Sequence, residues 1–433
     1  MHNLLRLSSL AEVPAHAEIS GWLDELRQRF AYDVAHSQLP SQKDETWRFT
    51  DLSDLLTLNF VAAQSTLVQP EAIAPFQIPE AQGAELVFIN GVYTPELSQT
   101  DALPKGVFVG NLATLPLDDN YDAIRFIAHH EGMPDVFTAL NTAGFPDVAI
   151  IWVSPDVVVE TPIHLLWVTV PGSQPTLIQP RGLVISDRNS QLSLIEQYVT
   201  CGTTDETTPY LTNAVMEMFV HDNATLTHTR LQQESAAAQH IATTMVRQAQ
   251  DSTYTCNTLD LGAKLSRHAP SVWQKGSGTT TILNGLTLIK NEQVSDTHSL
   301  IALKHPHGQT DQLHKCVVDE AAQAVFSGKV LVPQAAQQTN AAQLNRNLLL
   351  SSKARVTTQP QLQITADNVQ CTHGATVSQI DADELFYLQS RGINVDQAKV
   401  LLLRAFAAEV IERMAIESVR DRLTKAVANY TKA

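Results

Sequence analysis

Apolar residues follow a helical period near the N-terminus of the chain. They recur at steps of three and four positions: Ile19, Trp22, Leu23, Leu26 and Phe30. Residues spaced in this way share one face of an α-helix, so the pattern predicts an amphipathic helix here. Shorter helices are predicted near residues 121–130 and 135–142, and the Pro-bearing stretch 69–79 is typical of a linker.

Between residues 83 and 380 the helical period gives way to short alternating runs. Apolar residues alternate there with Ser, Thr and Gln, which predicts half-buried β-strands. Several runs also resemble one another, and they begin at Asn189, Asn223, Gly262, Lys353 and Asn368. So long a segment of short strands without amphipathic helices predicts a repeated β architecture, for which a parallel β-helix, a propeller and stacked sandwiches are the candidates.

Composition favours one of these candidates. Charged residues make up 17% of the chain, against about 25% in an average soluble protein. In a parallel β-helix identical positions stack about 4.8 Å apart, where like charges would repel and uncharged polar side chains would not. The low charge therefore favours a parallel β-helix, with an array of β-sandwiches as the alternative.

Helical patterning returns in residues 381–433. Asp381 and Glu384 have the spacing of a capping box, and Gly392 is placed to end this first helix. A second helix is predicted from Asn394, and two apolar stripes follow: Leu403, Phe406, Val410 and Met414, then Ile416, Val419, Leu423, Val427 and Tyr430. The stripes either pack on one another or form a docking surface.

These patterns predict three domains. They are an N-terminal helical domain with a linker (1–82), a parallel β-helix core (83–380) and a C-terminal helical domain (381–433).

Charge and cysteine usage exclude several classes of protein. The chain has 29 Lys and Arg against 45 Asp and Glu, a net charge of −16, which argues against a nucleic-acid partner. No apolar run reaches the ~18 residues of a transmembrane helix, and no secretory signal is evident. The four cysteines, at 201, 256, 316 and 371, form no CxxC pair. We therefore expect a protein of a reducing compartment, the cytoplasm.

Motifs for catalysis are missing, but one pair of residues suits a metal. There is no P-loop, G-x-S-x-G or H-E-x-x-H sequence, so no catalytic residue is predicted. Cys371 and His373 lie two positions apart, which on a strand puts both side chains on one face. A thiolate and an imidazole together suit zinc or an iron–sulfur cluster.

A cluster needs about four ligands, so this pair is either part of a shared site or an ordinary buried cysteine beside a core histidine. His314 and Cys316 repeat the spacing in reverse, and further imidazoles lie near them in the sequence, at His298, His305 and His307.

Several segments resemble the SufB/SufD family of iron–sulfur cluster assembly proteins. They are residues 47–50, 139–143, 160–163, 328–330, 341–351, 360–364, 366–377 and 385–393. The most specific is Cys371-Thr-His-Gly-Ala-Thr376, followed by Phe386-Tyr-Leu-Gln-Ser-Arg-Gly-Ile393. SufB proteins usually carry His-Glu-Ala-Thr where this chain has His-Gly-Ala-Thr, which favours the SufD branch.

The resemblance implies a right-handed parallel β-helix flanked by helical domains, acting as a non-enzymatic scaffold in a cytoplasmic complex with SufB and the ATPase SufC. It implies that a transient Fe–S cluster forms at the interface with SufB, where Cys371 and His373 match the family positions. It further implies that SufC binds the C-terminal helical region, for which Phe386, Tyr387, Arg391 and Gly392 are the candidate contacts. A reduced flavin is expected in the assembled complex and is assigned to no residue.

Two alternatives stay open beside this reading. One is a self-sufficient scaffold that acts as a homodimer. The other is a carbohydrate-active enzyme built on a β-helix, which the low charge and the missing secretory signal count against.

Overall fold

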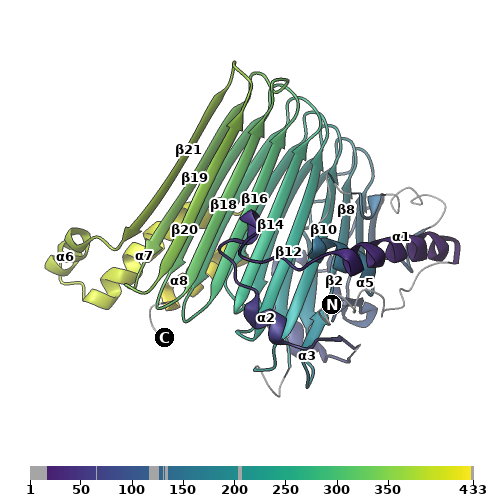
Figure 1. The fold of residues 1–433 in the computed structure, drawn as a ribbon, viewed down its shortest axis with the longest axis horizontal. Coiled ribbons are helices and arrows are strands. Elements are labelled where there is room, and N and C mark those ends of the chain that lie inside the picture. The colour runs from purple at the N-terminus through teal and green to yellow at the C-terminus, as the bar shows by residue number, and fades with distance from the viewer. Residues whose placement is uncertain are drawn as a thin grey trace.

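The computed structural model describes residues 17–64, 66–116, 126–129, 131, 135–202 and 207–430. Its centre is a β-solenoid of about eight turns, with helices before and after it in the chain (Figure 1). The mainly β core with flanking helices is thereby confirmed. The helix predicted near 121–130 lies largely outside the described residues.

Two sheets with mostly parallel pairing form the solenoid, and from β8 onward successive strands alternate between them. Within the described residues, sheet A contains β1 (Val61–Ala62), β4 (Val107–Asn111), β5 (Ala149–Val153), β7 (Thr176–Ile178), β8 (Arg181–Ser186), β10 (Tyr210–Val220), β12 (Ala238–Gln248), β14 (Leu265–Gln274), β16 (Val294–Leu303), β18 (Gln323–Val332) and β20 (Arg355–Ile364). Sheet B contains β2 (Glu85–Ile89), β3 (Val92–Tyr93), β6 (Ile163–Thr169), β9 (Gln191–Thr200), β11 (Thr225–Gln233), β13 (Thr253–Asp260), β15 (Thr280–Ile289), β17 (Gln309–Val318), β19 (Asn340–Leu349) and β21 (Gln370–Gln379).

The repeated runs that begin at Asn189 and Asn223 precede β9 and β11, on successive turns of sheet B. The runs at Gly262 and Lys353 precede β14 and β20 of sheet A, so they do not lie at the same bend. Asn189 and Asn223 lie at equivalent bends with positive φ angles of 59° and 56°, a conformation that asparagine tolerates better than most residues. The Asn223 side-chain amide donates to Asn189 Oδ1 at 2.9 Å. Stacked turns therefore align the same residue type at the same bend.

Alternate residues of each strand face the interior between the two sheets. One continuous apolar cluster fills it from Leu86 on β2 to Val332 at the end of β18, and Cys371 on β21 packs at its edge. A strand has two faces, so the residues between these point outward, where the helices cover them.

N-terminal helices cover the outer face of sheet A. They are α1 (Ala17–His36), η2 (Glu45–Trp47), α2 (Ser53–Thr57) and α5 (Val136–Gly144), joined to the solenoid through α3 (Pro70–Ile73), η3 (Ala74–Phe76) and η4 (Pro79–Ala81), while η5 (Pro95–Leu97) follows β3. The predicted N-terminal helix is confirmed as α1, whose Ile19 and Leu23 pack with Ile185 and Phe219 of the sheet.

Two segments with family resemblance anchor this cover. Trp47 is buried under the Arg267 guanidinium, 4.0 Å from its ring centroid. The Asn141 side chain on α5 donates to the carbonyls of Pro180 and Asn213 at 2.8 and 2.7 Å. The Asn141 bonds satisfy backbone groups where the sheet meets the helix, and the contact with Arg267 holds Trp47 against the sheet. Both segments therefore have a structural role.

The C-terminal helices are α6 (Ala382–Ser390), α7 (Val395–Ile411) and α8 (Glu417–Asn429). Both predicted starts are confirmed, because Asp381 accepts from the Asp383 and Glu384 amides and Asn394 accepts from the Gln397 amide. Gly392 ends the first helix with a φ of +85°. No helix among the described residues has the length and apolar character needed to cross a membrane.

The apolar stripes of α7 and α8 lie on the outer face of sheet B. Leu403, Val410 and Leu423 form one buried cluster with Leu286 and Leu313 of the sheet. Beside this cluster, Lys315 Nζ of β17 pairs with Glu409 Oε2 of α7 at 2.6 Å. The stripes therefore pack against the solenoid of the same chain as well as against each other.

Candidate functional site at the open end of the solenoid

The last turn of the solenoid exposes the edges of both sheets. β20 pairs with β18 and β21 with β19, and neither has a further strand beside it among the described residues. β21 is mostly exposed along its length, and β20 is half-buried or exposed throughout, unlike the strands of the earlier turns. Exposed edges carry unpaired backbone donors and acceptors that another strand can bond.

Cys371 and His373 lie on β21 at this open end. In the parallel register Cys371 is opposite Ala341 and His373 is opposite Gln343, so both belong to columns that face the interior. Cys371 is half-buried, and burial raises the pKa of its thiol, whereas the His373 side chain is exposed. The strand thus places a thiol and an imidazole together at the mouth of the interior.

This pair is not a complete metal site. Within the described ranges no group of three or more His, Cys, Asp or Glu side chains is arranged to hold a metal ion. Two ligands fall short of the about four that a cluster takes.

The column that contains His373 continues inward through polar side chains. Gln343 donates to Gln312 Oε1 at 2.8 Å, and Gln312 donates to Ser299 Oγ of the facing sheet at 2.8 Å. The same column then passes Leu283 and reaches Cys256. Amide side chains that bond one another satisfy polar groups inside an otherwise apolar core.

Sequence reasoning missed a buried group in the middle of the solenoid. His228 Nε2 lies 2.8 Å from Glu196 Oε2, and its Nδ1 lies 3.7 Å from Cys256 Sγ. Burial would lower the pKa of His228, but Cys256 and Glu196 outweigh it and raise that pKa to about 9. Burial also opposes ionisation of Cys256, yet His228 lowers the pKa of its thiol on balance.

Register, and not spacing along the chain, brings these three groups together. His228 is the partner of Cys256 in the adjacent strand, and Glu196 lies on the strand before them. Aligning the runs that begin at Asn189 and Asn223 would have placed Glu196 and His228 near one another, which is the signal available from sequence.

The second Cys–His pair of the sequence, His314 and Cys316, is fully buried and separate from Cys371 and His373. Burial lowers the pKa of His314 to about 4 and raises the pKa of Cys316 to about 12, so both groups are neutral. His298 lies in sheet A, where burial and the charge of Arg267 lower its pKa to about 4. The structure does not gather these residues into a ligand set.

The candidate partner contacts lie on α6, beside the open end (Figure 1). Phe386 and Tyr387 are 71% and 58% exposed, which is unusual for large apolar side chains. The Arg391 guanidinium lies 5.3 Å from the Tyr387 ring centroid, and Gly392 ends the helix. No residue of α6 is fully buried, and all but Leu385 and Leu388 are exposed.

Comparisons with known proteins cover nearly the whole chain. The SufBD core domain of SUF system FeS cluster assembly matches residues 168–406, and the SufBD protein N-terminal region matches residues 6–165. A SufBD family iron–sulfur cluster assembly protein of Synechocystis is 46% identical over 430 residues, which is 98% of this chain and 95% of that protein.

Two further relatives come from different compartments or lineages. The iron–sulfur cluster assembly protein SufD of Escherichia coli is 30% identical over 405 residues, 92% of this chain and 90% of its own. The chloroplastic protein ABCI7 of Arabidopsis thaliana is 38% identical over 406 residues, 92% of this chain and 84% of its own.

Proposed function

The chain belongs to the SufBD family of the SUF iron–sulfur cluster assembly system, and from this premise we propose that it is a SufD-type scaffold subunit without catalytic activity of its own. Its substrate is the nascent Fe–S cluster. We retain the division into domains at 1–82, 83–380 and 381–433, and the cytoplasm as the compartment, as parts of this proposal. A chloroplastic relative makes the compartment a separate question for localisation experiments.

The exposed edge of β21 carries the proposal. An edge strand with free backbone groups pairs readily with a strand of another chain. Cys371 and His373 lie on that strand and face the mouth of the interior. A SufB subunit that extends sheet B would bring its own ligands to the same mouth, and the four-ligand requirement would then be met across the interface.

SufC docking is assigned to α6 in this proposal, and not to α7 or α8. The stripes of α7 and α8 are already buried against sheet B. Phe386 and Tyr387 offer exposed aromatic surface of the kind that anchors protein interfaces. SufC would hydrolyse the ATP that drives cluster assembly, which agrees with the absence of a P-loop from this sequence.

The test is the variant His373→Ala in the complex with SufB and SufC. Because the His373 side chain is exposed, the variant is expected to fold and to co-purify with both partners. Removing one ligand should lower anaerobic cluster formation at least about 10-fold, measured by visible absorption after supply of iron and sulfide. His36→Ala, another exposed histidine far from β21, is the matched control.

Two results would overturn parts of this proposal. Unchanged cluster loading in His373→Ala would remove the histidine from the ligand set. A stable chromophore on the isolated chain, with a dimeric mass in solution, would favour the self-sufficient homodimer over a site shared with SufB.

A further inference from the structure

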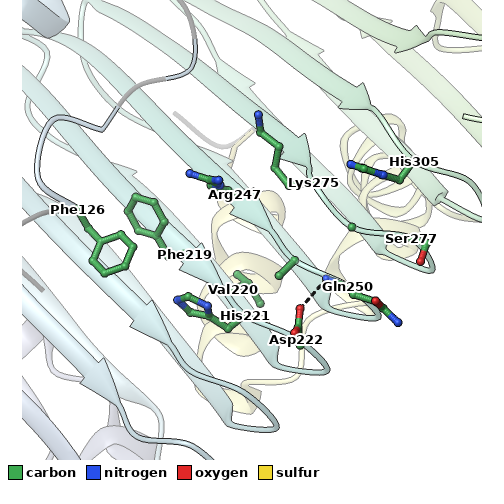
Figure 2. A pocket seen from close by; sticks show the side chains of 12 residues that line it. Phe126, Phe219, Val220, His221, Asp222, Arg247, Gln250, Lys275, Ser277 and His305 are labelled. Atoms are coloured by element: carbon green, nitrogen blue, oxygen red, sulfur yellow. Dashed lines mark hydrogen bonds between the residues drawn. The ribbon is translucent and has the colours of Figure 1, made fainter. Parts of the chain in front are cut away.

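A groove lies on the outer face of sheet A, where β10, β12 and β14 end (Figure 2). It has a volume of 550 Å³ and is lined by Phe126, Phe219, His221, Arg247, Lys275 and His305, among others. Pockets for small molecules span about 300–1,000 Å³. The groove is separate from β21 and takes no part in the proposed scaffold function.

Parallel register collects positive charge along this groove. Phe219 on β10 is beside Arg247 on β12, which is beside Trp273 on β14. Lys275 and Lys304 follow β14 and β16 directly, and their amides continue the same parallel bonding, to Gln248 O at 2.7 Å and Gln274 O at 3.3 Å. Three cations from consecutive turns, Arg247, Lys275 and Lys304, therefore share one face.

These three cations outnumber the two carboxylates at the groove, which are Asp222 in its lining and Glu131 beside it. Glu131 pairs with Lys275 at 2.6 Å and with Lys304 at 4.0 Å. No carboxylate within the described ranges lies at ion-pair distance from Arg247. Burial lowers the pKa of Lys304, and the charges of Lys275 and Arg247 lower it further. Positive charge thus concentrates locally on a chain whose net charge is −16.

Aromatic rings form the other end of the groove, as Figure 2 shows. The Phe126 and Phe219 rings lie 4.6 Å apart between centroids, and the His221 ring meets Phe126 edge-on at 6.2 Å. Flat ring surfaces of this kind take a planar ring by offset stacking.

We propose that this groove binds a small phosphate monoester that carries a planar ring, as a nucleoside monophosphate does. The phosphate accepts charge-assisted hydrogen bonds from Arg247 and Lys275, and displaces the Glu131 carboxylate from Lys275. The ring packs against Phe126. Cations alone would bind any phosphate. The aromatic end of the groove therefore favours a phosphate monoester that carries a planar ring.

The test measures binding of AMP, ribose 5-phosphate and inorganic phosphate to the full chain by calorimetry at low and moderate salt. AMP is expected to bind at least about 10-fold more tightly than ribose 5-phosphate, because stacking adds to the phosphate contacts. Affinity for AMP should fall as salt rises, since charge pairs are screened.

Variants with opposite expected signs separate a site from general charge. Arg247→Gln should weaken AMP binding at least about 10-fold, and Glu131→Gln should strengthen it, because a competing carboxylate is removed. Phe126→Leu should weaken AMP binding but leave inorganic phosphate unchanged. Arg346→Gln is the matched control, since Arg346 is a half-exposed arginine on β19 of the other sheet, and circular dichroism checks the fold of each variant.

Three outcomes would overturn the inference. AMP that does not saturate the wild-type chain at about 5 mM, far weaker than ordinary ligand sites, rejects the site. Equal affinities for AMP and ribose 5-phosphate reject the ring-binding end. An equal effect of Arg346→Gln and Arg247→Gln would show that AMP binds through general surface charge and not at this groove.

Discussion

Cys371–His373 and His314–Cys316 have the same spacing and face the same interior, yet their chemistry differs. The inner pair is fully buried, which holds both groups neutral. The outer pair lies on the last strand, where the histidine contacts solvent. The spacing alone does not distinguish the two pairs, because nothing in a local pattern reveals how many further turns of the solenoid cover a residue.

His314 of the inner pair should lower the free energy of unfolding at acid pH. The pKa of His314 is lowered to about 4 in the fold, against about 6.5 unfolded. At this residue the unfolded chain therefore binds more protons than the folded chain. The stability that neutral His314 permits is fully present above pH 6.5 and is lost as pH falls toward 4. At pH 5 the loss from this residue is about 2 kcal/mol.

His314→Gln should reduce this loss. Urea unfolding at pH 7 and at pH 5 measures it, and the stability difference between the two pH values should be smaller in the variant than in the wild-type chain. An identical pH dependence in both chains would mean that His314 is not held neutral. The comparison uses the slope with pH, so a general loss of stability from repacking does not affect it.

At the scale of elements, capping residues and periodicity predicted where the terminal helices begin and end. Asp381, Asn394 and Gly392 act at the expected positions. The stripes on α7 and α8 did not reveal what they pack against, because an apolar stripe is the same whether it meets another helix, a sheet or a partner. Their burial on sheet B also changes how docking must be tested. Deleting residues 381–433 would expose that apolar face and destabilise the core.

Point substitutions on α6 are the cleaner test of docking. Phe386→Ala with Tyr387→Ala should weaken SufC binding at least about 10-fold, because exposed aromatic anchors dominate interface energies. Thermal unfolding should change little, since no residue of α6 is buried. Tyr32→Ala, which removes an exposed aromatic from α1, is the control. SufC binding that survives the double substitution would contradict docking through α6.

At the scale of the whole molecule, the last strands of the two sheets, β20 and β21, lie at the same end of the solenoid but differ in the backbone donors of their free edges. Alternate residues of an edge strand direct their backbone N–H outward. On β20 the Arg355 amide bonds Ala322 on the inner side, so the even-numbered residues face the free edge, and Pro360 lacks an N–H there. Proline at such a position blunts an edge against pairing. β21 contains no proline, so its free edge retains all its donors.

Alternating polarity and low charge predicted the solenoid, whereas the assignment of its chemistry to Cys371 and His373 stays a prediction. What sequence could not supply is the register between turns, which decides that Glu196, His228 and Cys256 meet. Turn lengths vary, from 34 residues between the equivalent bends at Asn189 and Asn223 to 28 residues between those at Asn223 and Asp251. Each change shifts which residues stack, and only three-dimensional pairing fixes the outcome.

The asymmetry of the two edges predicts which sheet continues into a partner. On β21 the Gln370 amide bonds Thr339, so the amide of Ala375 points to the free edge. Ala375→Pro therefore removes an outward donor without breaking a bond to β19, and the isolated chain should keep its fold. Pairing with SufB, measured by co-purification and sedimentation, should be lost. Pro360→Ala restores a donor on β20 and should leave pairing intact. The reverse result, with pairing kept in Ala375→Pro and altered in Pro360→Ala, would assign the interface to sheet A.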